Sequence, residues 1–257
     1  MKESDLTPRA HVQYKIIICG AAGIGKTTLL HRHLEGNFLQ NPKTTLGGKA
    51  SVQEVRSKYD WDTEQGLGGI ARVMEDETES FTYWDLGGQH IFSQLRPTYM
   101  TGANAIIIAF ALNNRQSFFE AEESDQSIGQ FLHELIRALG IDIKTIPTLL
   151  VGTKCDLEHK IQPQEVDYIA RKLKKAGMNI VAYINNKFEG LQIYGNWSNK
   201  DVGDKKIMWD DSATKRWIST SSKTGENVSL AFEIIKKSLR EIKRVKKMNT
   251  QWPRKSF

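Results

Sequence analysis

The feature that most constrains this chain is the octapeptide GAAGIGKT at residues 20–27. It follows residues 14–19, a short β-branched run typical of a buried strand, and it precedes Leu29, Leu30 and Leu34, which share one face of a helix. The pattern GxxxxGK[ST] between a strand and a helix is that of a phosphate-binding P-loop. An accidental glycine turn would not account for both flanking elements.

The glycines and polar residues of this loop have distinct physical roles. Gly20 and Gly25 permit backbone angles and close approaches that a Cβ atom would block. The loop N–H groups and the helix N-terminus then point at an anion. Lys26 is expected to reach the β- and γ-phosphates of a nucleotide, and the Thr27 hydroxyl to bind Mg²⁺. The predicted nucleotide contacts of the loop are Gly20, Ala21, Ala22, Gly23, Ile24, Gly25, Lys26, Thr27 and Thr28.

The composition is that of a soluble globular protein, because 39% of the 257 residues are hydrophobic and 26% are charged. No run approaches the roughly 18 apolar residues of a membrane span, and the N-terminus lacks the apolar core of a signal peptide. Cys19 and Cys155 are far apart in the sequence, which favours a reducing interior over a disulfide framework. Of the net charge of +6, residues 236–257 carry +8, so the rest of the chain is slightly acidic.

Strands and helices alternate along the chain. Residues 105–111 and 148–152 are continuous apolar runs and predict buried strands, whereas residues 49–69 are polar and glycine-punctuated and predict a loop. This alternation predicts a doubly wound, mostly parallel α/β sheet with helices on both faces and a ligand at the carboxyl ends of the strands. The other expected elements are strands at 70–74 and 80–84 around an acidic turn at 75–77, helices at 124–139 and 164–176, and a strand at 217–220. A long closing helix is also expected, with an apolar stripe of Val228, Phe232, Ile235, Leu239 and Ile242.

A second group of candidates follows the strand expected at 80–84. Asp85 is placed like the acid that holds Mg²⁺ through water in P-loop enzymes. Gly88 offers a bare backbone N–H to a γ-phosphate, and Gln89 can orient an attacking water. Phosphoryl transfer depends mainly on positioning and charge neutralisation, so Lys26 and Gln89 are candidate catalytic residues.

Four motifs, in order, resemble those of the Ras-like small GTPase superfamily: GAAGIGKT at 20–27, WDLGGQ at 84–89, TKCD at 153–156 and SSK at 221–223. WDLGGQ is nearer to Arf-like members and the helix expected after it is nearer to Rab members, so the resemblance assigns no subfamily. It implies the P-loop NTPase fold of a small G domain, with Mg²⁺ as cofactor and GTP and GDP as substrate and product.

The third and fourth motifs imply recognition of guanine. By this resemblance Asp156 accepts hydrogen bonds from guanine N1 and N2, which adenine cannot supply. Lys154 stacks its stem across the base, and Ser222 with Lys223 closes over it. Thr153 stands where the family usually has Asn, a replacement that Rho-type members share. The implied base-end residues are Thr153, Lys154, Asp156, Ser221, Ser222 and Lys223.

The resemblance also implies a threonine that closes over Mg²⁺ and the γ-phosphate and takes part in catalysis. Thr45 is the candidate, 18 residues after Thr27 and 40 before Asp85. The second separation exceeds that of Ras-type chains, so an insertion is expected to separate this switch from its strand. Ala22 occupies a position that is Gly in Ras, and its methyl group can crowd Gln89. The predicted metal ligands are Thr27, Thr45 and, through water, Asp85.

The motifs and the expected elements divide the chain into three segments. Residues 1–12 are expected to form a flexible extension, residues 13–245 the G domain and residues 246–257 a basic tail. Insertions are expected near 46–69 and 178–215. The second insertion is rich in aromatic residues, for which a satellite core and a partner-binding surface are both open. These aromatics are Tyr183, Phe188, Tyr194, Trp197 and Trp209.

The closing helix carries a basic stripe that predicts either a solvated face or an electrostatic contact with an anionic membrane. Neither a prenylation Cys at the C-terminus nor a Gly at position 2 is present, so no lipid anchor is expected. Nucleic acid is a weaker interpretation, because no recognition motif accompanies the charges. The stripe consists of Lys236, Lys237, Arg240, Lys243, Arg244 and Lys247.

The leading interpretation is a slow, Mg²⁺-dependent GTPase that switches the binding of partner proteins in signal transduction or vesicle trafficking. Its expected partners are effectors, exchange factors and GTPase-activating proteins, and its expected location is cytoplasmic or peripheral at a membrane. One alternative is a non-hydrolysing GTP/GDP-binding scaffold that presents the aromatic insert. A P-loop ATPase or nucleotide kinase is a third, but it gives no reason for Asp156 or the SSK motif.

Overall fold

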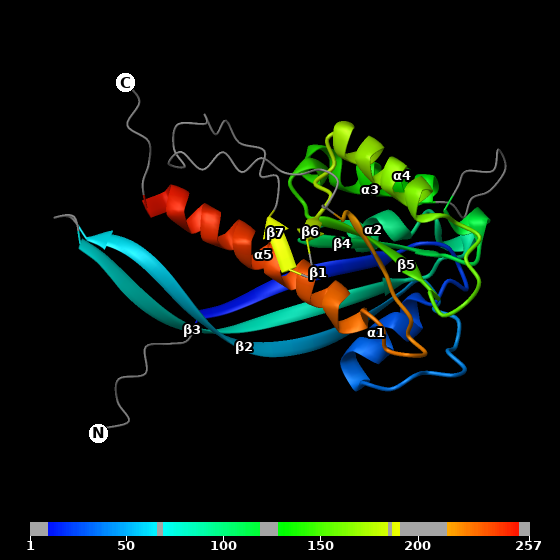
Figure 1. The fold of residues 1–257 in the computed structure, drawn as a ribbon, viewed down its shortest axis with the longest axis horizontal. Helices are drawn as coiled ribbons and strands as arrows, with labels where there is room; N and C mark the ends of the chain where they lie inside the picture. Colours follow the sequence, from blue (N-terminus) through cyan, green and yellow to red (C-terminus); the bar gives the residue numbers. More distant parts are fainter. Residues whose placement is uncertain (1–9, 66–68, 119–127, 185–186, 191–214, 252–257) are drawn as a thin grey trace.

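The structure, a computed structural model, describes residues 10–65, 69–118, 128–184, 187–190 and 215–251. One sheet has the strand order β2-β3-β1-β4-β5-β8. β2 pairs antiparallel with β3, and the other pairings in this sheet are parallel (Figure 1), so the predicted fold class is confirmed. The strands are β1 (Ala10–Cys19), β2 (Gly48–Gln65), β3 (Gly69–Leu86), β4 (Ala105–Ala111), β5 (Thr148–Thr153) and β8 (Trp217–Ser219).

Helices cover both faces of this sheet. Along β1, Ile16 and Ile18 enter a core shared with α1 and α5, whereas Ile17 and Cys19 enter a core shared with α2, α3 and α4. Because both faces are buried, the strand is a continuous apolar run. The helices are α1 (Lys26–Glu35), α2 (Arg96–Met100), α3 (Ile128–Leu139), α4 (Pro163–Lys175) and α5 (Val228–Gln251), with 3₁₀ turns η1 (His90–Phe92), η2 (Arg115–Ser117) and η3 (Gly140–Lys144).

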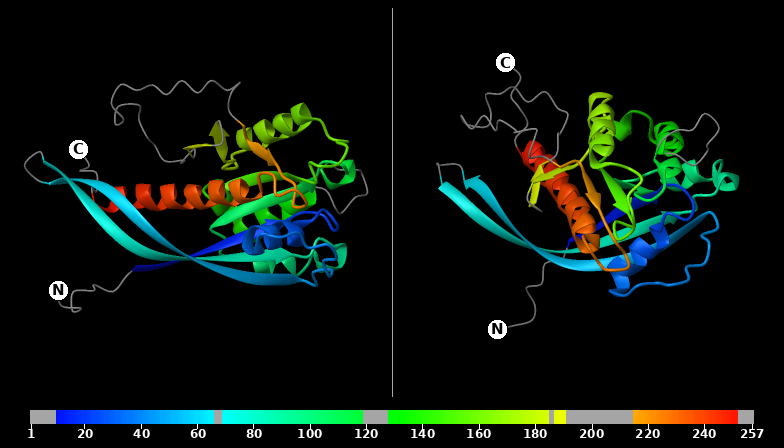
Figure 2. Two further views of the ribbon diagram at one scale, coloured as in Figure 1. Left: turned by 60° about the horizontal axis from the view of Figure 1, so that its bottom comes forward. Right: turned by 45° about the vertical axis from the view of Figure 1, so that its right-hand side comes forward.

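The two longest strands correct the prediction for the first insertion. β2 and β3 pair in register from Gly48↔Leu86 to Gln65↔Gly69, so residues 49–65 and 69 form strands rather than the loop expected at 49–69, whose residues 66–68 lie outside the described residues. The turn expected at 75–77 is also wrong, because these residues belong to β3. Figures 1 and 2 show this hairpin extending well beyond the other strands. Its additional residues therefore project away from the end of the sheet at which β2 starts and β3 ends.

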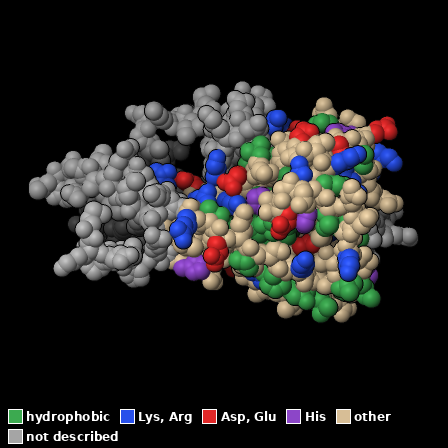
Figure 3. Space-filling model, turned by 90° about the horizontal axis from the view of Figure 1, so that it is seen from below, with side chains coloured by type: hydrophobic (Ala, Val, Ile, Leu, Met, Phe, Trp, Pro, Cys, Tyr) green, Lys and Arg blue, Asp and Glu red, His purple; other side chains and the backbone are tan. Residues whose placement is uncertain are grey.

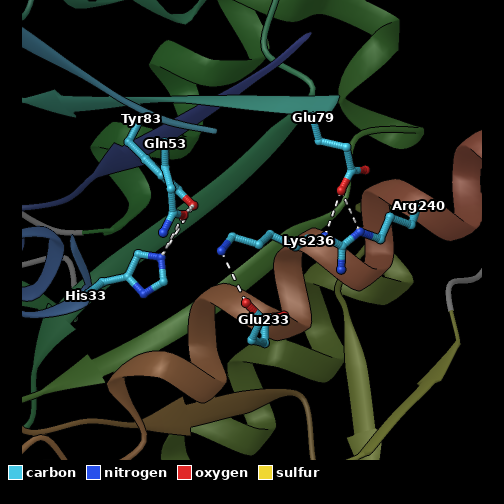
Figure 4. Close-up of polar contacts among 7 residues, drawn as sticks. All are labelled: His33, Gln53, Glu79, Tyr83, Glu233, Lys236 and Arg240. Carbon is cyan, nitrogen blue, oxygen red and sulfur yellow. Dashed lines mark hydrogen bonds and ion pairs between the residues drawn. The ribbon is translucent and has the colours of Figure 1, made fainter. Parts of the chain in front are cut away.

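The basic stripe of α5 faces β3 over part of its length (Figure 4). The Arg240 guanidinium donates to one carboxylate oxygen of Glu79 at 2.7 and 3.0 Å, and the Glu79 side chain is fully buried. Lys243 pairs with Glu77, and Lys236 is only 3% exposed. The interpretation of the stripe as a solvated face is therefore wrong for these three basic residues.

A second cluster of polar side chains, His33, Gln53 and Tyr83, joins α1 to the sheet and to α5 (Figure 4). The His33 ring stacks on Phe232 with centroids 4.0 Å apart, and its Nε2 lies 3.3 Å from Gln53 Oε1, which also accepts from the Tyr83 hydroxyl at 3.1 Å. Burial lowers the pKa of His33 to about 4, and the positive charge of Lys236 acts in the same direction. His33 is therefore neutral at neutral pH, as its place among aromatic rings requires.

Two predicted segment boundaries differ from the observed ones. β1 begins at Ala10, so residues 10–12 belong to a strand rather than to an extension. α5 continues to Gln251, so the start of the predicted tail at 246–257 is helical. Both elements are longer than expected because they accompany the long hairpin, β1 by pairing with β3 and α5 by the ion pairs to it.

The second insertion begins as a small antiparallel sheet of β6 (Ala182–Ile184) and β7 (Lys187–Gly190). Most of its aromatic residues lie at 191–214, outside the described residues, as do positions 124–127 of the helix predicted at 124–139. The satellite core and the partner surface therefore stay predictions.

The surface of the described part carries both signs of charge. On the face seen in Figure 3, basic and acidic side chains are interspersed among polar and hydrophobic ones. Among the described helices, none combines the length and the hydrophobicity needed to cross a membrane.

Candidate functional site

A cavity of about 500 Å³ lies at the carboxyl ends of the parallel strands, where the sequence predicts a ligand. Segments far apart in the sequence line it: the loop after β1, the chain before β2, the end of β3, and the loops after β5 and β8. Fifteen of the predicted residues line the cavity, namely Ala22, Gly23, Ile24, Gly25, Lys26, Thr27, Thr28, Thr45, Gly88, Gln89, Thr153, Lys154, Asp156, Ser222 and Lys223. Gly20, Ala21, Asp85 and Ser221 lie behind it and hydrogen-bond to residues that line it.

The backbone of the P-loop requires glycine at two predicted positions. Gly20 has φ 140°, and a Cβ atom there would lie 2.1 Å from the carbonyl oxygen of Ala109. Gly25 has φ 97° and caps α1, which starts at Lys26. The loop therefore packs onto β4 and presents the start of α1 to the cavity, the arrangement that binds an anion.

Lys26, the last residue but one of the P-loop motif, is a buried cation that lines the cavity. Its Nζ donates to the carbonyl oxygens of Gly20 at 2.8 Å and Ala21 at 2.7 Å, and the residue is 6% exposed. Burial lowers the pKa of Lys26 to about 8, while the negative charge of Asp85 opposes this shift. An anionic ligand would stabilise the charged form, so the environment of Lys26 fits a phosphate.

Three oxygen-bearing side chains from three segments, Thr27, Thr45 and Asp85, meet beside Lys26. The Thr27 hydroxyl donates to Asp85 Oδ2 at 2.5 Å, the Thr45 hydroxyl lies 3.0 Å from the same oxygen, and the two hydroxyls are 2.9 Å apart. Asp85 Oδ1 is buried and has no hydrogen-bond partner among the described residues. Two hydroxyls and a carboxylate with an unpaired oxygen are hard ligands that fit Mg²⁺.

The hairpin explains why Thr45 reaches this group despite the insertion. Gly48 pairs with Leu86, so residues 45 and 85 remain neighbours at the base of the hairpin however far its arms extend. The expectation that the insertion separates this switch from its strand is wrong.

The WDLGGQ segment lies in close contact with the P-loop and with the chain before β2. A Cβ atom on Gly88 would lie 2.3 Å from the backbone of Ala21 and Ala22, and one on Gly87 would lie 2.6 Å from the Thr45 carbonyl oxygen. Both positions therefore require glycine. Gln89 is exposed at the rim of the cavity.

The TKCD segment follows β5, which β1 and β4 separate from β3, so it lines the far side of the cavity from Asp85 and contacts the P-loop there. Lys154 adopts a left-handed backbone with φ 59°, and its Nζ donates to the Gly23 carbonyl oxygen at 2.7 Å, so its stem crosses the loop. The Thr153 hydroxyl is buried between the carbonyl oxygens of Ile24 at 2.6 Å and Phe110 at 3.0 Å. The Thr153 side chain therefore supports the P-loop, because its one proton is used by the protein.

Asp156 presents its carboxylate to solvent at this end of the cavity. The buried Ser221 hydroxyl donates to Asp156 Oδ1 at 2.6 Å and accepts from the Thr224 backbone N–H at 3.1 Å. Ser221 therefore orients Asp156 from behind, whereas Ser222 and Lys223 line the cavity itself.

Sequence reasoning missed several lining residues and one support. Phe38 lines the cavity and is 39% exposed. It stands out in the sequence as the only Phe, Tyr or Trp between Gly20 and Lys58. Arg96 is the largest fully buried side chain in the part of the chain that the structure describes, and it contacts the WDLGGQ segment, which no motif indicates. The other unpredicted lining residues are Leu39, Gln40, Pro42, Lys43, Thr44, Leu86, Gly87 and Leu157.

Comparisons with known proteins agree with this geometry. A family model described as the Ras family matches residues 15–192. Ras-related protein Rab-7b of Bos taurus is 30% identical over 161 residues, 63% of this chain and 68% of the relative, and the Homo sapiens protein of that name is 30% identical over 161 residues, 63% and 69%. The Ypt/Rab-type GTPase avaA of Emericella nidulans is 28% identical over 153 residues, 60% and 63%.

A mostly parallel α/β sheet with a P-loop at the carboxyl ends of its strands defines a nucleotide-binding protein of the P-loop class. The family match is more specific. The chain belongs to the Ras family of GTP-binding GTPase switches.

Proposed function

We propose that this chain binds GTP together with Mg²⁺, hydrolyses it to GDP and phosphate, and changes its affinity for partner proteins as it does so. One observation carries most of this proposal. The hydroxyls of Thr27 and Thr45 and the carboxylate of Asp85 converge beside Lys26, at the opposite end of one cavity from Asp156.

The part of the cavity lined by Lys154, Asp156, Ser222 and Lys223 supports a preference for guanine. Asp156 would accept hydrogen bonds from N1–H and the N2 amino group of guanine, a pair of donors that adenine lacks. Its orientation is set by Ser221, so little entropy is lost on binding. The stem of Lys154 and the ring of Phe38 would lie against the faces of the base, and Ser222 with Lys223 would cover its edge.

The phosphate end would neutralise the charge of the triphosphate. Backbone N–H groups of residues 20–27 and the N-terminus of α1 would hold the α- and β-phosphates, and Lys26 would bridge the β- and γ-phosphates. Thr27 and Thr45, with Asp85 through water, would hold Mg²⁺, which would neutralise negative charge on the phosphates.

Hydrolysis would need a positioned water. The Gln89 side chain would orient a water in line with the γ-phosphorus. The water oxygen forms the new bond to phosphorus as the bond to the β–γ bridging oxygen breaks, GDP leaves with that electron pair, and the water proton passes to the released phosphate. Gln89 lies at the rim and is exposed, so the intrinsic rate should be low until a partner orders it.

The partner surface would lie around the two segments that contact the γ-phosphate. Leu46 and Ile91 are 75% and 77% exposed, and they follow Thr45 and Gln89 closely in the sequence. Exposed apolar side chains beside nucleotide-sensing segments suit effectors and activating proteins that read the GTP state. Exposed cations of α5 such as Lys237 would be those that meet an anionic membrane.

The test is single-turnover hydrolysis by the wild-type chain, loaded with γ-labelled GTP and incubated with excess Mg²⁺ or with a chelator. We expect one phosphate per bound nucleotide with Mg²⁺ and a rate at least roughly 10-fold lower with the chelator, because the metal neutralises the transferring group. Labelled ATP is the control for base choice and should not be retained. Tight GTP binding with no phosphate release at any Mg²⁺ concentration would instead make the chain a nucleotide-held scaffold.

A further inference from the structure

Arg96, the first residue of α2, is a fully buried cation seven residues beyond Gln89. Its Nη1 donates to the carbonyl oxygen of Gly87 at 3.2 Å and to that of Gln89 at 2.8 Å. These two carbonyls flank Gly88, so one guanidinium holds the backbone on both sides of the residue that packs against the P-loop.

The guanidinium is itself fixed by α3. Its Nε and Nη2 donate to the two carboxylate oxygens of Glu134 at 2.6 Å each, and Glu134 is 3% exposed. Gln130 donates to Glu134 at 3.0 Å, and the Phe131 ring lies 4.7 Å below the guanidinium carbon. Four of the five guanidinium N–H groups are thus used, in a bidentate geometry that lysine cannot reproduce.

The bond to the Gly87 carbonyl determines where the Gly88 N–H points. The two groups belong to one trans, planar peptide unit and are directed oppositely. With the carbonyl held by Arg96, the N–H faces away from the guanidinium. Gly88 lines the cavity whereas the buried Arg96 does not, so an N–H that faces away from the guanidinium is directed toward the cavity.

We propose that Arg96, held by Glu134, is a positioning residue that aims the Gly88 N–H at the γ-phosphate and fixes the backbone of Gln89 beside it. This inference rests on the proposed function and deepens it, because it names the residue that couples α3 to the group that senses the γ-phosphate. Arg96 acts through the backbone and does not touch nucleotide.

The test uses Arg96→Lys together with the double variant Arg96→Met/Glu134→Gln, which removes both buried charges and so avoids leaving Glu134 unpaired. Arg115→Lys is the matched control, because Arg115 makes a bidentate pair with Glu165 on the surface, at 2.9 and 3.2 Å. We expect both Arg96 variants to hydrolyse GTP roughly 10- to 100-fold more slowly, the cost of a small misplacement of a reacting group.

A second readout separates positioning from a merely structural role. The preference for a slowly hydrolysed GTP analogue over GDP should fall in both Arg96 variants, because only the analogue has a γ-phosphate, while GDP affinity stays within about twofold. Hydrogen exchange at residues 86–92 should be faster in these variants without nucleotide. The Arg115→Lys protein should match wild type in all three measurements.

Each outcome of these measurements supports or overturns the positioning role of Arg96. If wild type hydrolyses GTP and both Arg96 variants match it in rate, in analogue preference and in exchange, the inference is overturned. If wild type binds GTP without hydrolysing it, the proposed function fails, but the analogue preference and the exchange at 86–92 still decide the role of Arg96. Equal losses of GDP and analogue affinity would overturn it in favour of a structural role.

Discussion

Replacing Asp156 with Asn is expected to abolish tight binding of guanine nucleotides while leaving the fold intact. The carboxylate would accept two hydrogen bonds from guanine, and bonds to a charged acceptor contribute about 1.5–3 kcal/mol each. The asparagine amide keeps one acceptor but turns an N–H donor toward a donor of the base. GTP affinity should therefore fall roughly 10²- to 10⁴-fold.

The same change should create a preference for xanthine nucleotides. Xanthine carries a carbonyl oxygen in place of the guanine N2 amino group, so the asparagine NH₂ can donate to it while the amide oxygen accepts from N1–H. Competition of GTP and XTP against a fluorescent nucleotide measures both effects.

Asp142→Asn is the matched control for Asp156→Asn, because Asp142 is an exposed aspartate in η3 that does not line the cavity. It should leave both affinities unchanged. An Asp156→Asn protein that keeps wild-type GTP affinity would show that this carboxylate does not read the base.

Lys26→Met is expected to lower the affinity for GTP roughly 10²- to 10⁴-fold, because it removes about 3–5 kcal/mol of charge-assisted hydrogen bonding to the phosphates. Methionine is similar in length to lysine and can fill the buried site. Isothermal titration of nucleotide-free protein measures the loss.

Two observations separate this effect from unfolding. Burial lowers the pKa of Lys26, so without a phosphate the buried charge carries a desolvation cost, and the variant's unfolding midpoint should not fall by much. Lys172→Ala, an exposed lysine of α4, is the control and should bind GTP as wild type does. Unchanged GTP affinity in Lys26→Met would contradict the assignment of the phosphate end.

Local sequence patterns predicted the fold and the lining of the site because those features are local. A P-loop requires glycine at positive φ followed at once by a helix, and both constraints are visible within residues 20–27. The buried parallel strands are continuous apolar runs, since helices cover both of their faces. Of the motif residues, Asp85 lies at the end of β3, and Lys154 and Asp156 follow the apolar strand β5.

The hairpin could not be predicted because its stability depends on pairing across the chain. Residues 75–77, an acidic run typical of a turn, lie in β3 opposite residues 57–59 of β2, and the charge of Glu77 is paired with Lys243 of α5. Residues 75–79 of β3 are all polar and so carry no apolar alternation of their own. These acidic residues are stabilised in a strand by basic residues of α5, which lies far away in the sequence.

The supporting roles of Thr153, Ser221 and Arg96 were not predicted, for the same reason. Thr153 and Ser221 have motif positions, but their hydroxyls face the protein, and Arg96 reaches its partners only because α2 packs on α3. Spacing identifies residues that meet a ligand through a shared motif. It does not identify residues that act by holding another residue in place.

The most direct test of the central claim, that this chain hydrolyses GTP through Gln89, is the single-turnover rate of phosphate release from Mg²⁺–GTP in wild type and in Gln89→Leu. Leucine cannot orient water, so we expect a rate at least roughly 10-fold lower with GTP affinity unchanged. Gln94→Leu, an exposed glutamine in the same segment, should match wild type. Equal rates of phosphate release in wild type and Gln89→Leu would contradict the account.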